Sequence, residues 1–313
     1  MLLKKPPYYI MLLFLIVFTS RASAQVEVLL KNPLEKIKDG HTHVIVDDVN
    51  SAESQDFLMV YKKYWKLTKG VDMVTVNNLK GNWVAGDSYF SLQSTFFRDT
   101  KGATNMYYYL TLWTPTDKTV KKNKDYDPNK EISIARIEFA AHGTSGEQLR
   151  LSFGDKVEIN NWHPGLLKNY LQQLTVALET DKKVKPWDAV TDKEQLALLK
   201  DGTLYCPEDN LYTLSMGGKS GKFTDTEVEE LFSGYKAKYK VISDNDLSEK
   251  ILNDKEQFYY LIFLNNTPYT LGRTLVVVNS RTGEIIYRYT HVSFTFNLKA
   301  SFLKDLYKEA AKN

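Results

Sequence analysis

Cysteine is almost absent from this sequence, since Cys206 is the only one among 313 residues. A single thiol excludes an intramolecular disulfide and every zinc site built from paired cysteines. An oxidising compartment stays compatible, because a chain with a large core does not require disulfides there. Cys206 precedes Pro207 in a polar stretch without a group that would activate a thiol, so we expect an unpaired, non-catalytic cysteine.

Long apolar runs are also scarce. The longest, Tyr8–Phe18, is shorter than the roughly 20 residues that a membrane-spanning helix needs. It follows the basic Lys4 and Lys5 and precedes an Ala-Ser-Ala pattern at residues 22–24, which together are typical of a secretory signal peptide. We therefore predict a signal peptide over residues 1–24, cleavage after Ala24, and a periplasmic or secreted protein without a transmembrane helix.

The chain that remains after cleavage has no excess charge of either sign. The signal holds three basic residues and no acid, so 38 of the 41 basic residues remain, against 38 acidic ones. A strong nucleic-acid binder shows a basic excess, so nucleic acid is not a predicted partner. With 43% hydrophobic and 13% aromatic residues, the chain can bury a sizeable core and is long enough for two domains.

Two stretches predict the same order of elements, β-α-β-α-β-β-β-α. The first predicts strands at His43–Val49, Met73–Val76, Ser88–Phe97, Met106–Thr114 and Ile132–Ala140, helices at Glu53–Leu67 and Leu166–Glu179, and a loop or short helix at Asn78–Val84. The second predicts strands at Leu211–Met216, Tyr239–Ile242, Gln257–Leu264, Thr274–Asn279 and Glu284–His291, and helices at Thr224–Tyr235, Asp246–Leu252 and Leu298–Lys312. Local sequence supports the match, because residues 76–79 (Val-Asn-Asn-Leu) align with residues 244–247 (Asp-Asn-Asp-Leu).

We therefore predict an α/β (α+β) fold of two similar units with mixed sheets, helices on one or both faces, and an internal duplication. The first domain is expected at residues 25–180 and the second at residues 211–313. Residues 181–210 are expected to be a linker with a short helix at Asp192–Leu199, and residues 115–131 a polar loop. The order of elements resembles that of small α/β domains in cell-envelope proteins. This resemblance carries no motif and implies no function or site residue.

Residues 217–222 (Gly-Gly-Lys-Ser-Gly-Lys) lie where a phosphate-binding loop would sit. That loop needs G-x-x-x-x-G-K-[ST], and here Met216 and Phe223 occupy two of the required positions. A loop between a strand and a helix is the favoured interpretation, and we predict no nucleotide or other cofactor.

Histidines are few and scattered. His41 and His43 could share one face of a strand with Asp47, but a metal needs three or four ligands, so no metal site is predicted. His142 and Ser145 lie close together without the G-x-S-x-G pattern of a hydrolase nucleophile. No catalytic residue can be named from these patterns.

Aromatic residues are concentrated in the predicted strands, and the candidate binding surface consists of Tyr107, Tyr109, Trp113 and Tyr259. Packing in the core is the ordinary use of such residues. The other use is a platform for sugar rings or for a partner protein, since Tyr and Trp are enriched in binding hot spots.

Export, duplication and the lack of a catalytic pattern favour a non-enzymatic binding or assembly module of the cell envelope, with an envelope protein or a glycan as partner. Two alternatives stay open. One is an exported hydrolase with its site at the interface of the two domains, where pockets tend to form. The other is a glycan-binding protein that uses an aromatic sheet face.

Overall fold

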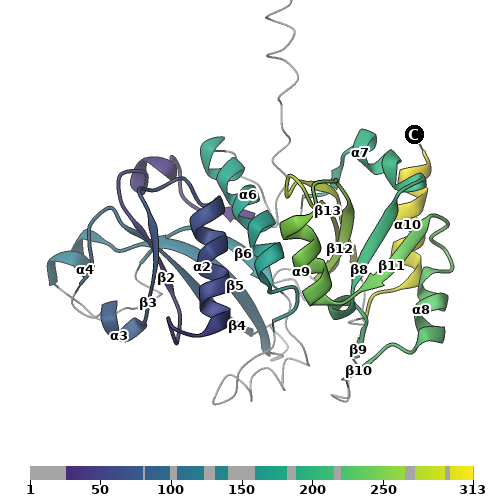
Figure 1. Ribbon diagram of the computed structural model, residues 1–313, viewed down its shortest axis with the longest axis horizontal. Coiled ribbons are helices and arrows are strands. Elements are labelled where there is room, and N and C mark those ends of the chain that lie inside the picture. Colours follow the sequence, from purple (N-terminus) through teal and green to yellow (C-terminus); the bar gives the residue numbers. More distant parts are fainter. Residues whose placement is uncertain are drawn as a thin grey trace, which may run out of the picture.

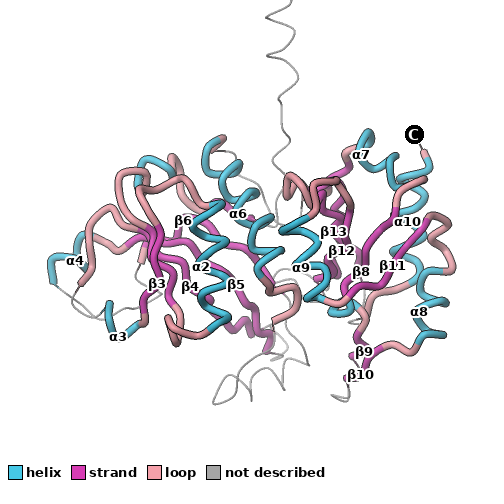
Figure 2. Tube along the Cα trace, viewed as in Figure 1, coloured by secondary structure: helices cyan, strands magenta, loops and turns pink. Residues whose placement is uncertain are grey.

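A computed structural model describes residues 26–79, 82–98, 104–122, 131–139, 159–181, 188–214, 220–264, 272–292 and 297–312. Within these ranges it contains two six-stranded mixed sheets and eight α-helices, arranged as two α/β units side by side (Figures 1 and 2). The predicted fold class is therefore confirmed. The predicted signal peptide lies outside the described residues, and no helix among them is long and apolar enough to cross a membrane.

The first sheet has the strand order β1-β6-β5-β4-β2-β3. Its strands are β1 (Val26–Val28), β2 (Thr42–Ile45), β3 (Val71–Val74), β4 (Ser88–Arg98), β5 (Thr104–Thr114) and β6 (Ile132–Phe139). The α-helices of this unit are α2 (Ala52–Tyr64), α3 (Val76–Leu79), α4 (Asp117–Lys122) and α6 (Pro164–Glu179), and a 3-10 turn, η1, spans Leu34–Lys36. Helix α4 lies in the segment that was predicted to be a polar loop.

The second sheet has the order β7-β14-β13-β12-β8-β11 when it is read from the corresponding edge. Its strands are β7 (Val190–Thr191), β8 (Thr203–Pro207), β11 (Lys238–Ile242), β12 (Tyr259–Leu264), β13 (Gly272–Asn279) and β14 (Ile285–Val292). Its helices are α7 (Lys193–Ala197), η2 (Leu198–Lys200), η3 (Glu208–Asn210), α8 (Asp225–Phe232), α9 (Asp244–Asn253) and α10 (Ala300–Ala311). Strands β9 (Tyr212–Leu214) and β10 (Ser220–Lys222) form a separate antiparallel pair.

The two sheets have the same topology. In the first sheet, β2 is parallel to its neighbours β3 and β4, and the pairs β4–β5, β5–β6 and β6–β1 are antiparallel. In the second sheet, β8 is parallel to its neighbours β11 and β12, and the pairs β12–β13, β13–β14 and β14–β7 are antiparallel. Both sheets also have a bulge at the same place. In the β5–β6 pair, Ile134 is left without a partner next to Leu112, and in the β13–β14 pair, Ile286 is left without a partner next to Val277. Equal strand order, direction and bulge position are what an internal duplication would produce.

The segment at residues 181–210, predicted to be a linker, contributes two strands to the second sheet. Strand β8 is the centre of its parallel part, between β11 and β12, and β7 is an edge strand. The predicted strand at Leu211–Met216 instead forms β9, which pairs only with β10 among the described strands. The second unit thus begins earlier in the chain than the sequence pattern suggested.

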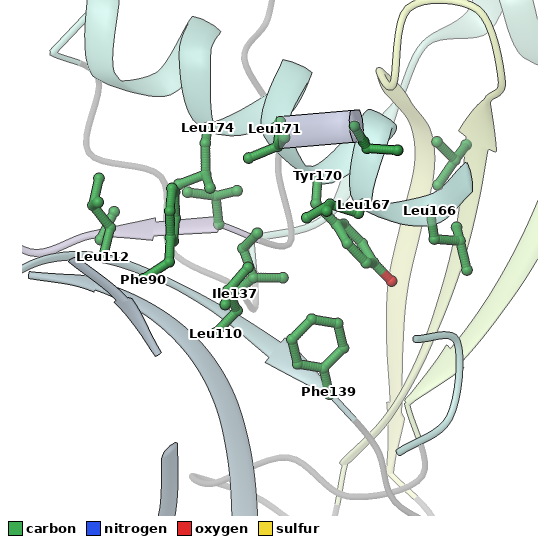
Figure 3. Packing of buried hydrophobic residues seen from close by; sticks show 14 of the residues in the cluster. Phe90, Leu110, Leu112, Ile137, Phe139, Leu166, Leu167, Tyr170, Leu171 and Leu174 are labelled. Atoms are coloured by element: carbon green, nitrogen blue, oxygen red, sulfur yellow. The ribbon is translucent and has the colours of Figure 1, made fainter. Parts of the chain in front are cut away.

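Helix α6 packs on the first sheet through its apolar face. Tyr170, Leu171 and Leu174 lie over Phe90 and Ile137 in one continuous hydrophobic cluster (Figure 3). All five side chains are at most 1% exposed. Burial of side chains of this size supplies much of the stability of a fold, at about 25 cal/mol per Å² of apolar surface.

The same helix also joins the two units, because it lies against α9 (Figure 1). The amide of Gly165 donates to Ser248 Oγ at 3.0 Å, and Lys168 Nζ donates to the carbonyl of Ile251 at 2.8 Å. The Tyr260 hydroxyl of β12 donates to Asn169 Oδ1 at 2.8 Å. The cluster around α6 therefore continues into the second sheet, and the units share one core.

Candidate functional site

The carboxyl ends of β8 and β11 lie side by side at a switch point of the second sheet, where the chain leaves the two strands toward opposite faces. These strands are adjacent and parallel, pairing from Thr203 with Lys238 to Pro207 with Ile242. After β8 the chain leads to α8, which packs in the core on one face of the sheet, whereas after β11 it leads to α9 on the opposite face. Open α/β sheets leave a crevice at such a switch point, and ligands commonly bind there.

A pocket of about 490 Å³ lies at this switch point. Its charged lining residues are Glu208, Lys222, Asp225 and Glu229, and its apolar ones are Leu211, Phe223, Val228 and Val241. They come from η3, the base of the β9–β10 hairpin, the first turns of α8, and β11. The pocket thus combines an apolar lining with three carboxylates and one ammonium group.

Local hydrogen bonds hold the wall of this pocket in place. Lys222 Nζ lies 3.1 Å from Glu208 Oε2, and this contact raises the pKa of the lysine. The amide of Phe223 donates to the Leu211 carbonyl at 2.9 Å, which closes the base of the hairpin. At the start of α8 the amide of Glu227 donates to Thr224 Oγ1 at 3.3 Å, and the amide of Thr224 donates to Glu227 Oε2 at 2.7 Å. These two bonds form a capping box, which fixes the start of α8.

Cys206 lies in β8, close to this region of the sheet, but it is fully buried. Burial raises the pKa of its thiol to about 12. A thiol in this state is not a nucleophile at neutral pH, which agrees with the expected unpaired, non-catalytic role.

The histidines at the start of β2 do not form the arrangement considered from the sequence. His43 faces Asp72 through Nδ1 and lies 3.1 Å from Asp87 Oδ2 through Nε2, so its carboxylate partners are not Asp47. Its ring stacks on Tyr89 with a centroid distance of 5.1 Å. Within the described part of the chain, no group of three or more His, Cys, Asp or Glu side chains is placed to hold a metal ion.

The candidate aromatic surface is not gathered on one exposed face. Tyr109, Trp113 and Tyr259 are 5%, 1% and 5% exposed, and Tyr259 belongs to the core of the second unit. Trp113 stacks on Tyr89 at 4.6 Å, and the guanidinium of Arg136 lies 4.5 Å from the ring centre of Tyr109. Tyr107 lies in β5, but its side chain is outside the described residues. The three described rings pack in the core, whereas a platform for sugar rings needs solvent-exposed ring faces.

Two other segments considered from the sequence are described only in part or not at all. Residues 142–146 lie outside the described residues, as do residues 217–219 of the glycine-rich segment. The rest of that segment, Ser220–Lys222, is strand β10 and not a loop that leads into a helix.

The sequence patterns did not predict the pocket residues, because their position depends on which strands are neighbours in the sheet. One pattern could have indicated them: a strand at Thr203–Pro207 is followed at once by Glu208 and Asp209, and acidic residues directly after a parallel strand lie at the carboxyl edge of its sheet. Comparison of the chain with protein-family models, curated proteins and solved structures finds no match.

Proposed function

We propose that this protein is an exported, non-enzymatic binding module of the cell envelope, and that its pocket at the ends of β8 and β11 holds a segment of a partner protein. The observation that carries this proposal is the position of the pocket at the switch point of a parallel sheet. Export rests on the signal-peptide pattern of residues 1–24.

The lining of the pocket indicates the chemistry of the partner. Glu208, Asp225 and Glu229 outnumber the one ammonium group, and that group is already paired with Glu208. A lining of acidic and apolar side chains suits a segment in which Lys or Arg flanks an apolar side chain, because opposite charges steer the encounter and apolar burial stabilises the complex.

The lining of the pocket also favours a protein partner over a glycan. Sugar rings are commonly held against aromatic faces, and Phe223 is the one aromatic side chain among the eight that line the pocket. The aromatic residues of the candidate surface that the structure describes are buried.

Charge reversal at the pocket tests the proposal. Tagged protein is crosslinked in its native host, and the species that co-purify with the wild type are compared with those of Glu229→Lys. Glu194→Lys is the matched control, because Glu194 is an exposed helical glutamate of α7 outside the pocket. We expect one dominant protein partner, lost in Glu229→Lys and retained in Glu194→Lys. A carbohydrate adduct, or equal capture by both variants, would contradict the proposed use of the pocket.

A further inference from the structure

A polar cluster with three buried and two half-buried members lies where the segment before α6 meets the strand ends of the second unit. We call it the junction cluster, and it consists of Asn160, Asn161, His163, Asp209 and Asp244. The first three directly precede α6, Asp209 follows β8 within η3, and Asp244 is the first residue of α9 after β11. Three separate segments of the chain thus contribute to one place.

Asp209 is the centre of the junction cluster. The amide of Asn161 donates to Asp209 Oδ2 at 2.8 Å, and Asn160 Nδ2 donates to the Asp209 carbonyl at 3.3 Å. Asp209 and Asp244 each follow one of two adjacent parallel strands by two residues, since Pro207 pairs with Ile242, and their carboxyl groups interact. Because the amide group of Asn160 touches Asp209, its own oxygen lies in the same small region.

Several polar atoms in this cluster are buried without a hydrogen-bond partner. They are Asn160 Oδ1, Asn161 Oδ1 and Nδ2, His163 Nε2 and Asp244 Oδ1. Asn160 and Asn161 are 5% and 1% exposed. Buried polar atoms are almost always paired in native proteins, so this concentration points to a bound group.

The chemistry of the cluster is that of a hard cation. Three of the five unpaired atoms are oxygens, from Asn160, Asn161 and Asp244, and Asn160 and Asn161 both bond to Asp209. His163 Nδ1 accepts from the amide of Leu166 at 3.3 Å, so its Nε2 carries the proton and is an unpartnered donor, not a metal ligand. Carboxylate and amide oxygens from separate segments suit Ca²⁺, which takes six to eight oxygens in flexible geometry, better than the strictly octahedral Mg²⁺.

We propose that the junction cluster binds one calcium ion through the carboxylates of Asp209 and Asp244 and the amide oxygens of Asn160 and Asn161. The ion would tie the segment before α6 to the strand ends of the second unit. This proposal is independent of the partner held in the pocket, since it concerns a different set of side chains.

Calcium binding is tested on the purified protein after removal of metal with EDTA. We expect about 1 mM Ca²⁺, an affinity range typical of extracellular modules, to raise the melting temperature by roughly 5 °C, and Mg²⁺ to raise it much less. Tb³⁺, which replaces Ca²⁺, should luminesce when tryptophan is excited, because Trp162 lies between two residues of the cluster. Elemental analysis should give one calcium per chain.

Asp244→Asn should abolish both the temperature shift and the luminescence, because it removes a ligand charge while keeping the size of the side chain. Asp246→Asn is the matched control, since Asp246 lies in the same first turn of α9 but is exposed. Without calcium, Asp244→Asn should melt no lower than the wild type, because it removes the repulsion between two neighbouring acidic side chains. Absence of any calcium effect on the wild type, or an equal effect on Asp244→Asn, would overturn the proposal.

Discussion

Gly165 of α6 lies directly against Ser248 of α9. Its amide donates to Ser248 Oγ at 3.0 Å, and a Cβ atom on Gly165 would lie 2.6 Å from both the Cα and the carbonyl oxygen of Ser248. Only glycine allows the two helices to come this close. The close approach of α6 and α9 at this point therefore requires glycine.

Gly165→Ala should push α6 away from α9 and lower the free energy of unfolding by about 1–3 kcal/mol, the usual cost of overpacking. Urea denaturation measures this change. Gly221→Ala is the control, because a Cβ there would meet its nearest neighbour, Thr213 Oγ1, at an ordinary 3.6 Å. Equal stability of the two variants would mean that the helices can separate without loss.

Stability should fall as the pH rises through the neutral range, because of Glu138. Burial raises the pKa of this carboxyl from 4.5 to about 8, against a smaller lowering by Arg136. Between pH 4.5 and about pH 8, this carboxyl releases its proton in the unfolded chain but retains it in the folded chain, so the free energy of unfolding falls as the pH rises. Above about pH 8 the loss of stability is constant.

Glu138→Gln should remove this contribution to the pH dependence and be more stable than the wild type at pH 8.5 by about 1 kcal/mol or more, since each pKa unit corresponds to about 1.4 kcal/mol. Denaturation curves at pH 4.5, 6.5 and 8.5 measure the effect. The exposed Glu249→Gln should follow the wild type. A Glu138→Gln protein with unchanged pH dependence would show that this carboxyl is ionised in the folded state.

Cys206 should be inert in the folded protein. Its side chain is fully buried and the pKa of its thiol is about 12, so we expect a disulfide reagent to react more than roughly 100-fold faster after unfolding in guanidinium. Absorbance at pH 8 follows the reaction, and one thiol per chain should titrate once the protein is unfolded. Rapid modification of the folded protein would contradict the buried position of β8.

The protein isolated from its host should begin at Gln25. Basic residues, an apolar run and an Ala-x-Ala pattern predict cleavage after Ala24, and intact-mass measurement of the envelope and cytosolic fractions checks it. Ala24→Leu should leave the precursor uncleaved, since the cleavage site needs a small residue. An uncleaved chain found only in the cytosol would remove the basis for an envelope role.

Local patterns in the sequence predicted most of the helices and long strands. Phe57, Val60 and Tyr61 recur at helical spacing and lie on the buried face of α2, and Thr224, three residues before Glu227, caps the start of α8. Such features depend on neighbours three or four residues away, which a sequence displays directly. The order of elements was also enough to predict two similar units.

The residue-by-residue correspondence between the two units could be determined only from the structure. The alignment of residues 76–79 with residues 244–247 would match Phe90 with Phe258, since each lies 11 residues after the aligned leucine. The shared bulge and strand pairing instead make Leu261 the counterpart of Phe90. The displacement arises because α9 has 10 residues where α3 has 4. Strand β8 was missed because Gly202 and Pro207 at its ends are typical of a linker, and with it the pocket, which depends on β8 lying beside β11.

The most direct test of the proposed function is photo-crosslinking from the pocket itself. A photoreactive amino acid replaces Glu229, which lines the pocket, or Glu194, which lies outside it, and the protein is irradiated in its native host. Our account predicts one protein adduct from position 229, with a basic and apolar segment at the crosslinked site, and no such adduct from position 194. The same adducts from both positions, or none from position 229, would contradict it.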